Sequence, residues 1–290
     1  MHSLLLLAVI IAFFCDRFLN SRIALHSSRL FFYVVSKSFK MLSTMLPLGL
    51  TLFCIPFFLA TIVWGVLFLI YHLNIVFYLV LVVLLYISLV PFHSFVIDSY
   101  PDTDSSDGHQ FTSKGSAVIS VWAEQYGLSV DENSYSDVCW AGLLFERIIF
   151  APLLWSLVIG PWGLVFYFSY SQTKKFLATQ CLSSPFFLGI FEWCDLIPSR
   201  LMGLFMCLLT NFSNFFHRVD WFSYPPNFVP GNSDKFTLSF LQLFFLHDDS
   251  SSVVQDSDLD NKAFSLFRRT YYGMMMIVFA LLIIQATVLF

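Results

Sequence analysis

Long uncharged runs of apolar residues alternate with polar segments along this chain. No Asp, Glu, Lys or Arg lies between Lys40 and Asp98, and the closing run Tyr271–Phe290 is also uncharged. A helix needs about 20 apolar residues to cross the hydrocarbon core of a bilayer. The first run is long enough for two such helices, with His72–Asn74 as the best turn between them. The pattern predicts an all-α, polytopic membrane protein with four to six transmembrane helices.

The candidate transmembrane segments differ in length and charge. They cover approximately residues 4–15, 42–71, 75–97, 141–170, 185–210 and 271–290. Residues 98–140 and 211–270 are predicted to be polar segments of loop with some helix, and the chain is expected to form a single membrane domain. Segment 4–15 is short for a crossing, and segment 185–210 contains three ionisable residues. Hydropathy alone therefore leaves open whether these two segments cross.

The composition supports a bilayer as the surroundings of this chain. Hydrophobic residues make up 58% of the 290 residues, charged residues only 12%, and the mean hydropathy is +0.75. Soluble domains carry roughly 25% charged residues, so the excess apolar surface here requires contact with lipid. The net charge of −4 provides no basic surface for a nucleic acid.

The distribution of Lys and Arg predicts the orientation. If segment 185–210 crosses, most of these residues lie on one side of the membrane, which the positive-inside rule makes the cytoplasm. If the segment only re-enters, the two sides carry nearly equal numbers. The charge distribution therefore favours six crossings with both termini outside.

Five ionisable residues fall within predicted membrane segments, where a charge is expensive and usually has a partner. They are Glu146, Arg147, Glu192, Asp195 and Arg200. Glu192 and Asp195 are three residues apart and share a helix face. Pro152 and Pro198 are expected to shape the helices, with Pro198 bending or ending the second one. These charges form either a clamp between helices or a polar cavity for a small amphiphilic or anionic ligand.

The sequence carries no motif for a catalytic residue, a cofactor or a metal ion. The His and Cys residues do not follow a metal-ligand spacing, and glycine motifs for phosphate or dinucleotide binding are missing. We therefore predict no catalytic residue, cofactor or metal site.

Several blocks of this sequence resemble one family of bacterial membrane proteins. The central blocks are Arg147–Trp155 with Gly160–Gly163, and Cys194–Leu201 with Gly203. Arg268–Thr270 precedes the terminal apolar run, and the start contributes Asp16 and Arg17 within Phe14–Phe18. Together these blocks resemble the AmpE family, inner-membrane proteins encoded beside a cell-wall amidase in Gram-negative bacteria.

This resemblance implies a non-enzymatic regulatory protein of the inner membrane. Such a protein is linked to β-lactamase induction and to sensing of cell-wall turnover, with a regulatory partner protein. The AmpE family is itself similar to adenosylcobinamide-phosphate synthase, a membrane enzyme of the cobalamin pathway. That enzyme carries an N-T-L-D-S motif where this chain has Phe166–Ser171, so its catalytic residues are not carried over.

Two further functions remain as alternatives. A membrane enzyme acting on a corrinoid or another large amphiphile would use the same charges as phosphate clamps. A small-molecule transporter would have its site at an unwound helix near Pro198.

Overall fold

The computed structural model describes residues 2–16, 22–90, 119–124, 128, 137–180, 182, 184–209, 219, 221, 232–246 and 256–289. Within these residues all regular secondary structure is helical, which confirms the predicted all-α class. Most of residues 98–136 and 210–231 lies outside this description, so much of the two predicted polar segments is not described.

The amino-terminal half contains the predicted helical hairpin. This half of the chain has four described helices, α1 (His2–Asp16), α2 (Arg22–Leu42), α3 (Leu48–Leu73) and α4 (Ile75–Leu89), of which α3 and α4 form the hairpin. The side-chain oxygen of Asn74 accepts hydrogen bonds from the N–H groups of Val76 at 2.9 Å and Phe77 at 3.1 Å, which caps the start of α4. The break between α3 and α4 therefore falls at Asn74, the last residue of the expected turn, while His72 and Leu73 remain in α3. Residues 91–97 of the predicted segment 75–97 lie outside the described residues.

Helix α3 begins later than the predicted residue 42. Helix α2 ends at Leu42, and Pro47 has an extended backbone conformation at the start of α3. Proline favours the first positions of a helix because it lacks an N–H group, so the new helix begins there. Pro56 remains inside α3.

The prediction of one helix over residues 141–170 is wrong. The structure has α7 (Asp137–Phe145), the π-helix η1 (Glu146–Phe150), α8 (Ala151–Ile159) and α9 (Pro161–Thr179). Gly160 separates α8 from α9 with a φ of 80°, a left-handed conformation that glycine adopts readily. Pro161 then occupies the first turn of α9. The chain thus changes direction where an uninterrupted crossing was expected. The predicted orientation assumed one crossing by this segment, so that assumption no longer holds.

The carboxy-terminal part adds three helices. They are α10 (Pro185–Leu209), α12 (Asn232–Leu246) and α13 (Asp256–Leu289). Helix α10 continues through Pro198, so this proline does not end it. Helix α12 lies within the predicted polar segment 211–270, and α13 begins well before the predicted residue 271.

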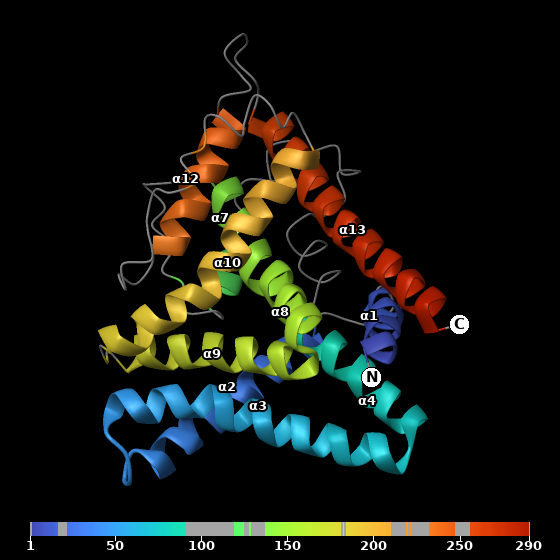
Figure 1. The fold of residues 1–290 in the computed structure, drawn as a ribbon. Helices are drawn as coiled ribbons and strands as arrows, with labels where there is room; N and C mark the ends of the chain where they lie inside the picture. Colours follow the sequence, from blue (N-terminus) through green and yellow to red (C-terminus); the bar gives the residue numbers. More distant parts are fainter. Residues whose placement is uncertain are drawn as a thin grey trace.

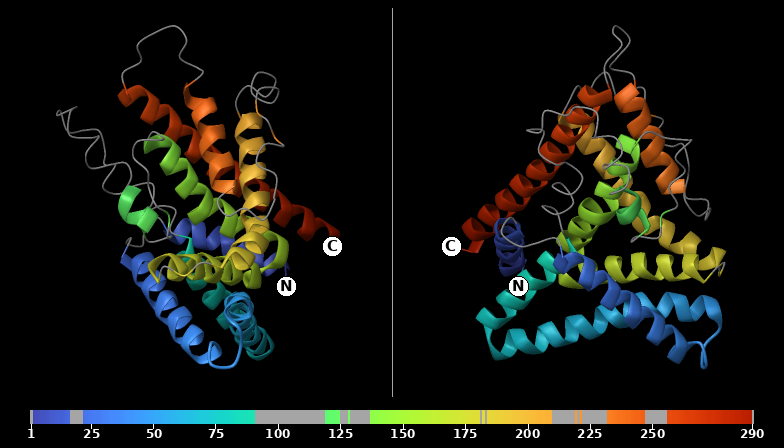
Figure 2. Two further views of the ribbon diagram at one scale, coloured as in Figure 1. Left: turned by 90° about the vertical axis from the view of Figure 1, so that its left-hand side faces the viewer. Right: turned by 180° about the vertical axis from the view of Figure 1, so that it is seen from behind.

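The helices form two groups on either side of α9. Helix α9 lies alongside α3, and α2 also packs against it (Figure 1). The reverse view again places α9 next to α3 (Figure 2). Helices α7, α10 and α12 pack together on the other side, while α1 contacts both α4 and α13. The groups meet through α8, which packs against α9 beyond the Gly160 turn.

Two of the described helical stretches are long and apolar enough to cross a membrane. They are Leu48–Leu73 and Val138–Ile159, the latter combining most of α7 with η1 and α8. The first exposes large apolar side chains such as Phe58 and Leu69, whereas the second is mostly buried within the protein. Apolar side chains that point outward along a helix of this length are typical of contact with lipid.

Candidate functional site: a buried charge cluster

Helices η1, α9, α10 and α12 bring six ionisable side chains together in the interior. We call this set the charge cluster; it consists of Glu146, Arg147, Lys174, Glu192, Asp195 and Asp234. Four of the five residues predicted from sequence belong to it. Lys174 and Asp234 were not predicted, because they lie outside the apolar core segments and look like ordinary surface charges in the sequence.

The π-helix η1 supplies the first two members of the charge cluster. Both Glu146 and Arg147 are buried, with exposed side-chain fractions of 0% and 5%. π-helical turns are rare and are frequently found at functional sites. Adjacent side chains on a helix point in different directions, and these two accordingly reach different helices: Glu146 reaches α12, and Arg147 reaches α10 and α12.

The central contact of the cluster is the ion pair between Arg147 and Asp195. Their side chains meet across η1 and α10, so the predicted pairing between two helices occurs for these residues. Asp195 is completely buried, so its carboxylate is withdrawn from bulk water. An ionised carboxylate in such surroundings needs both opposite charge and hydrogen-bond donors.

Helix α9 supplies the remaining donors to Asp195. The hydroxyl groups of Tyr167 and Tyr170 each donate to one carboxylate oxygen at 2.9 Å, and the Lys174 amino group lies 3.2 Å away. Their spacing of three and four residues places all three donors on one face of the helix. The Tyr167 hydroxyl also accepts a hydrogen bond from Arg147 at 3.3 Å. Asp195 is therefore held by four donors from two helices.

Asp234, near the start of α12, forms a second ion pair with Arg147. Burial by itself would raise the pKa of Asp234, but Arg147 and Lys174 outweigh this effect and hold the pKa below its ordinary value. Burial would likewise lower the pKa of Lys174, but the nearby Asp195 carboxylate raises it instead. Both groups therefore remain charged at neutral pH.

Two further acids fix the first turns of α12. Glu192 accepts a hydrogen bond from the backbone N–H of Ser233. The first N–H groups of a helix lack intrahelical partners and carry partial positive charge, so they suit a carboxylate. One turn later, Thr237 and Glu146 are hydrogen-bonded through Oγ1 and Oε2. Helix α12 thus docks on the charge cluster through Ser233, Asp234 and Thr237.

Arg200 occupies a different environment from Arg147. Its guanidinium group lies over the ring of Phe236, 3.3 Å from the ring centroid. This is a cation–π contact between α10 and α12. Arg200 therefore supports the packing of α12, and the described contacts do not place it on Asp195.

The other residues predicted to shape the site have simpler positions. Pro152 lies in the first turn of α8, directly after η1. Pro198 lies inside the continuous α10, so the unwound segment that a transporter site would require is not present there. Asp16 is the last residue of α1, whereas Arg17 lies outside the described residues.

The charge cluster borders a small pocket lined by both cations. Arg147, Lys174 and Asp195 line it together with the α9 residues Tyr167, Tyr170 and Ser171. Its open space corresponds to about one water molecule. The pocket in this conformation is too small for a ligand the size of a corrinoid, but it has room for a water molecule.

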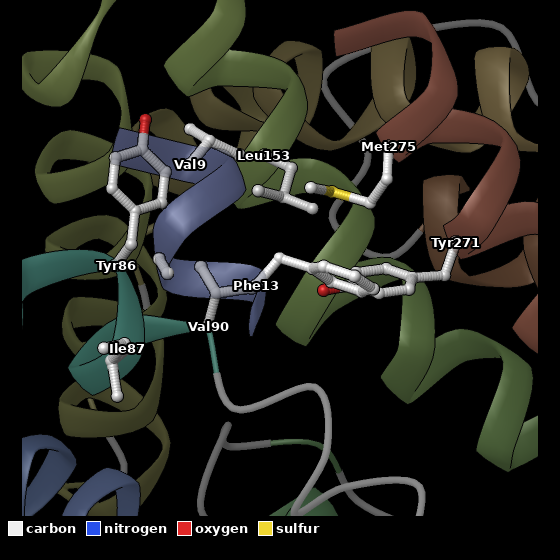
Figure 3. Close-up of a pocket in the computed structure, with 9 residues that line it drawn as sticks. Val9, Phe13, Tyr86, Ile87, Val90, Leu153, Tyr271 and Met275 are labelled. Atoms are coloured by element: carbon white, nitrogen blue, oxygen red, sulfur yellow. The ribbon is translucent and has the colours of Figure 1, made fainter. Parts of the chain in front are cut away.

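A second small cavity lies between α1, α4, α8 and α13, and its lining is almost entirely apolar (Figure 3). The rings of Phe13 and Tyr271 lie against each other there, with their centroids 5.3 Å apart. Its space is also close to that of one water molecule, and no charged side chain lines it. This cavity is a gap in helix packing, so the charge cluster remains the candidate functional site.

Comparison with known proteins identifies no relative of this chain: no family, curated protein or solved structure matches it.

Proposed function

We propose that this chain is a non-enzymatic regulatory protein of the Gram-negative inner membrane, of the AmpE type, that takes part in β-lactamase induction. The observation that carries the proposal is the Arg147–Asp195 ion pair. Arg147 opens one of the two central sequence blocks that resemble the AmpE family, and Asp195 lies in the other. A buried ion pair thus joins the two sequence blocks that carry the resemblance.

The arrangement of charges supports a structural and signalling role. Arg147 connects η1 to α10 and α12 at once, because it is paired with both Asp195 and Asp234. Lys174 adds α9 to the same contact. Because η1, α9, α10 and α12 share these contacts, a displacement of one element would disturb contacts made by the others, which suits the transmission of a signal through a helix bundle.

The same contacts favour this role over the alternative of a cobinamide-synthase-type enzyme. A phosphate clamp needs cationic groups that are available to the substrate. Arg147 and Lys174 are already neutralised by carboxylates of the protein, so a phosphate would have to displace Asp195 or Asp234. We therefore propose a regulator rather than an enzyme.

The proposal is tested in a Gram-negative host whose β-lactamase is inducible and whose own AmpE has been deleted. We expect the wild-type chain to restore the host's normal induction response to a β-lactam, and Arg147→Met to abolish this effect. Lys235→Met is the matched control, because Lys235 is an exposed cation next to Asp234 on α12. Membrane abundance of each variant is measured by immunoblot.

Two results would contradict the proposal. The first is that the wild-type chain accumulates in the membrane but leaves induction unchanged. The second is that Arg147→Met restores induction as fully as Lys235→Met at equal abundance.

A further inference from the structure

We propose that the charge cluster contains a proton-binding site: the Glu146 carboxyl group holds a proton that it shares with the Thr237 hydroxyl. The site joins η1 to α12, and its occupancy controls how α12 docks. This inference concerns the chemistry of the buried cluster and does not depend on the proposed role in β-lactamase induction.

The first support is an excess of acids over bases among the described residues of the charge cluster. The charge cluster contains four carboxyl groups but only two cations, Arg147 and Lys174. Counting Arg200 as well, although it lies over Phe236, still leaves one acid in excess. An uncompensated charge in a low-dielectric interior is expensive, and a buried acid avoids that expense by keeping its proton.

The second support is that the other three acids have strong partners. Asp195 receives two tyrosine hydroxyls in addition to Arg147 and Lys174. Asp234 is ion-paired with Arg147, and its side chain remains 21% exposed. Glu192 accepts from the backbone at the positive end of α12. Each of these environments stabilises an ionised carboxylate.

Glu146 has the weakest set of partners for a negative charge. It is fully buried, and among the described residues its Oε1 atom accepts no hydrogen bond. Within the described part of the chain its ion-pair partner is Arg147, whose Nη1 lies 4.0 Å from Oε1, and that guanidinium group is shared with two other carboxylates. Negative charge on Glu146 would therefore be poorly compensated.

The groups that face Glu146 from the neighbouring helices add to this effect. They are Arg147 on η1, Tyr167 on α9, Asp195 on α10 and Asp234 on α12. Two of the four are acids, and Arg147 is the one cation among them. A proton on Glu146 removes the repulsion from Asp195 and Asp234.

The contact with Thr237 provides a hydrogen-bond partner for a protonated Glu146 carboxyl group. The Thr237 hydroxyl donates to Glu146 Oε2 at 2.5 Å in the structure, and because a hydroxyl group can also accept, a protonated Glu146 can donate to it at the same separation. Loss of the proton would leave a buried carboxylate whose hydrogen-bond partners are this hydroxyl and any water that enters. Hydration of Glu146 would then require η1 and α12 to separate, which makes the docking of α12 dependent on the proton.

Infrared spectroscopy of the full chain in lipid vesicles tests the assignment directly. A protonated carboxyl group has a C=O stretching band that a carboxylate lacks. We expect one such band at neutral pH in the wild type and its loss in Glu146→Gln. The matched control is Glu192→Gln, which should keep the band because this substitution leaves the contact between Glu146 and Thr237 in place.

Variants of Thr237 test the site even if Glu146→Gln fails to fold. Thr237→Val removes the hydroxyl partner, so the band should move to higher frequency, while Thr237→Ser should leave it in place. The proposal is overturned if the band survives in Glu146→Gln, if it disappears in Glu192→Gln instead, or if Thr237→Val leaves its frequency unchanged.

Discussion

Replacement of Arg147 by methionine is the most informative single change in this protein. Methionine replaces the aliphatic part of the arginine side chain but lacks the guanidinium group that joins η1 to α10 and α12. Two carboxylates, those of Asp195 and Asp234, each lose an ion pair at once, although Asp195 keeps the one with Lys174. We expect a large loss of stability without any change in the surface of the protein.

The structure sets the expected magnitude. Removing one partner of a buried ion pair typically costs about 3–5 kcal/mol, because the other charge stays buried and unpaired. Asp195 would retain Tyr167, Tyr170 and Lys174, and the partly exposed Asp234 can be hydrated. These residual partners place the expected cost at the lower end, about 3 kcal/mol. For a chain of this size that corresponds to a Tm lower by about 6–12 °C.

A double-mutant cycle separates the ion pair from other effects of the substitution. Thermal unfolding in detergent is compared for Arg147→Met, Asp195→Asn and the double variant. Asparagine keeps one of the two oxygens that accept from the tyrosine hydroxyls and carries no charge. The double variant should therefore be more stable than the sum of the single changes predicts, by about 0.5–3 kcal/mol. Lys235→Met should stay within about 0.5 kcal/mol of the wild type, because Lys235 is exposed.

Strict additivity in the cycle would refute this reasoning, since it would mean that Arg147 and Asp195 do not stabilise one another. A Tm of Arg147→Met equal to that of Lys235→Met would refute it as well.

Three further predictions concern pH, helix packing and capping. Because Arg147 holds the pKa of Asp234 below its ordinary value of about 4, the stability from this pair is present above that pH and is lost as the pH falls through the lower folded-state value. Asp234→Asn should therefore reduce the acid dependence of Tm, and an unchanged profile would contradict the assignment. In Gly163→Ala, the new Cβ would lie 2.2 Å from a backbone oxygen of α8, so we expect a loss of about 1–3 kcal/mol in thermal unfolding. Gly65→Ala is its control, with no atom within 4 Å, and should be neutral or stabilising by about 0.5–1 kcal/mol. Asn74→Ala should cost about 1 kcal/mol by the same assay through loss of the α4 cap, and retention of wild-type Tm would show that the cap is dispensable.

Local sequence signals predict the helices well where the cause is itself local. The uncharged runs predict helix over most of α3 and α4, and the turn at Asn74 follows from a polar capping residue between two apolar stretches. The division at Gly160 also has a local signal, because Gly-Pro is a dipeptide typical of turns. Hydropathy averaged over a stretch long enough to cross a membrane does not show this division, since the residues on both sides of Gly160 are apolar.

The charge cluster is predictable only in part. A charged residue inside an apolar run demands a partner, so Arg147 and Asp195 stand out from sequence alone. Nothing in the sequence indicates that Asp234, 87 residues beyond Arg147, reaches the same guanidinium group, or that Lys174 joins it. The partners depend on how each helix is rotated and how it is placed along its neighbours.

The sequence by itself therefore determined the helical class, the apolar runs and the need to neutralise buried charge, because each follows from hydropathy, capping or the cost of burying a charge. Only the tertiary structure decided which groups satisfy that need. The docking of α12 and the face that α9 presents bring in Asp234, Lys174, Tyr167 and Tyr170, and the register between packed helices is set by side-chain contacts along their whole length.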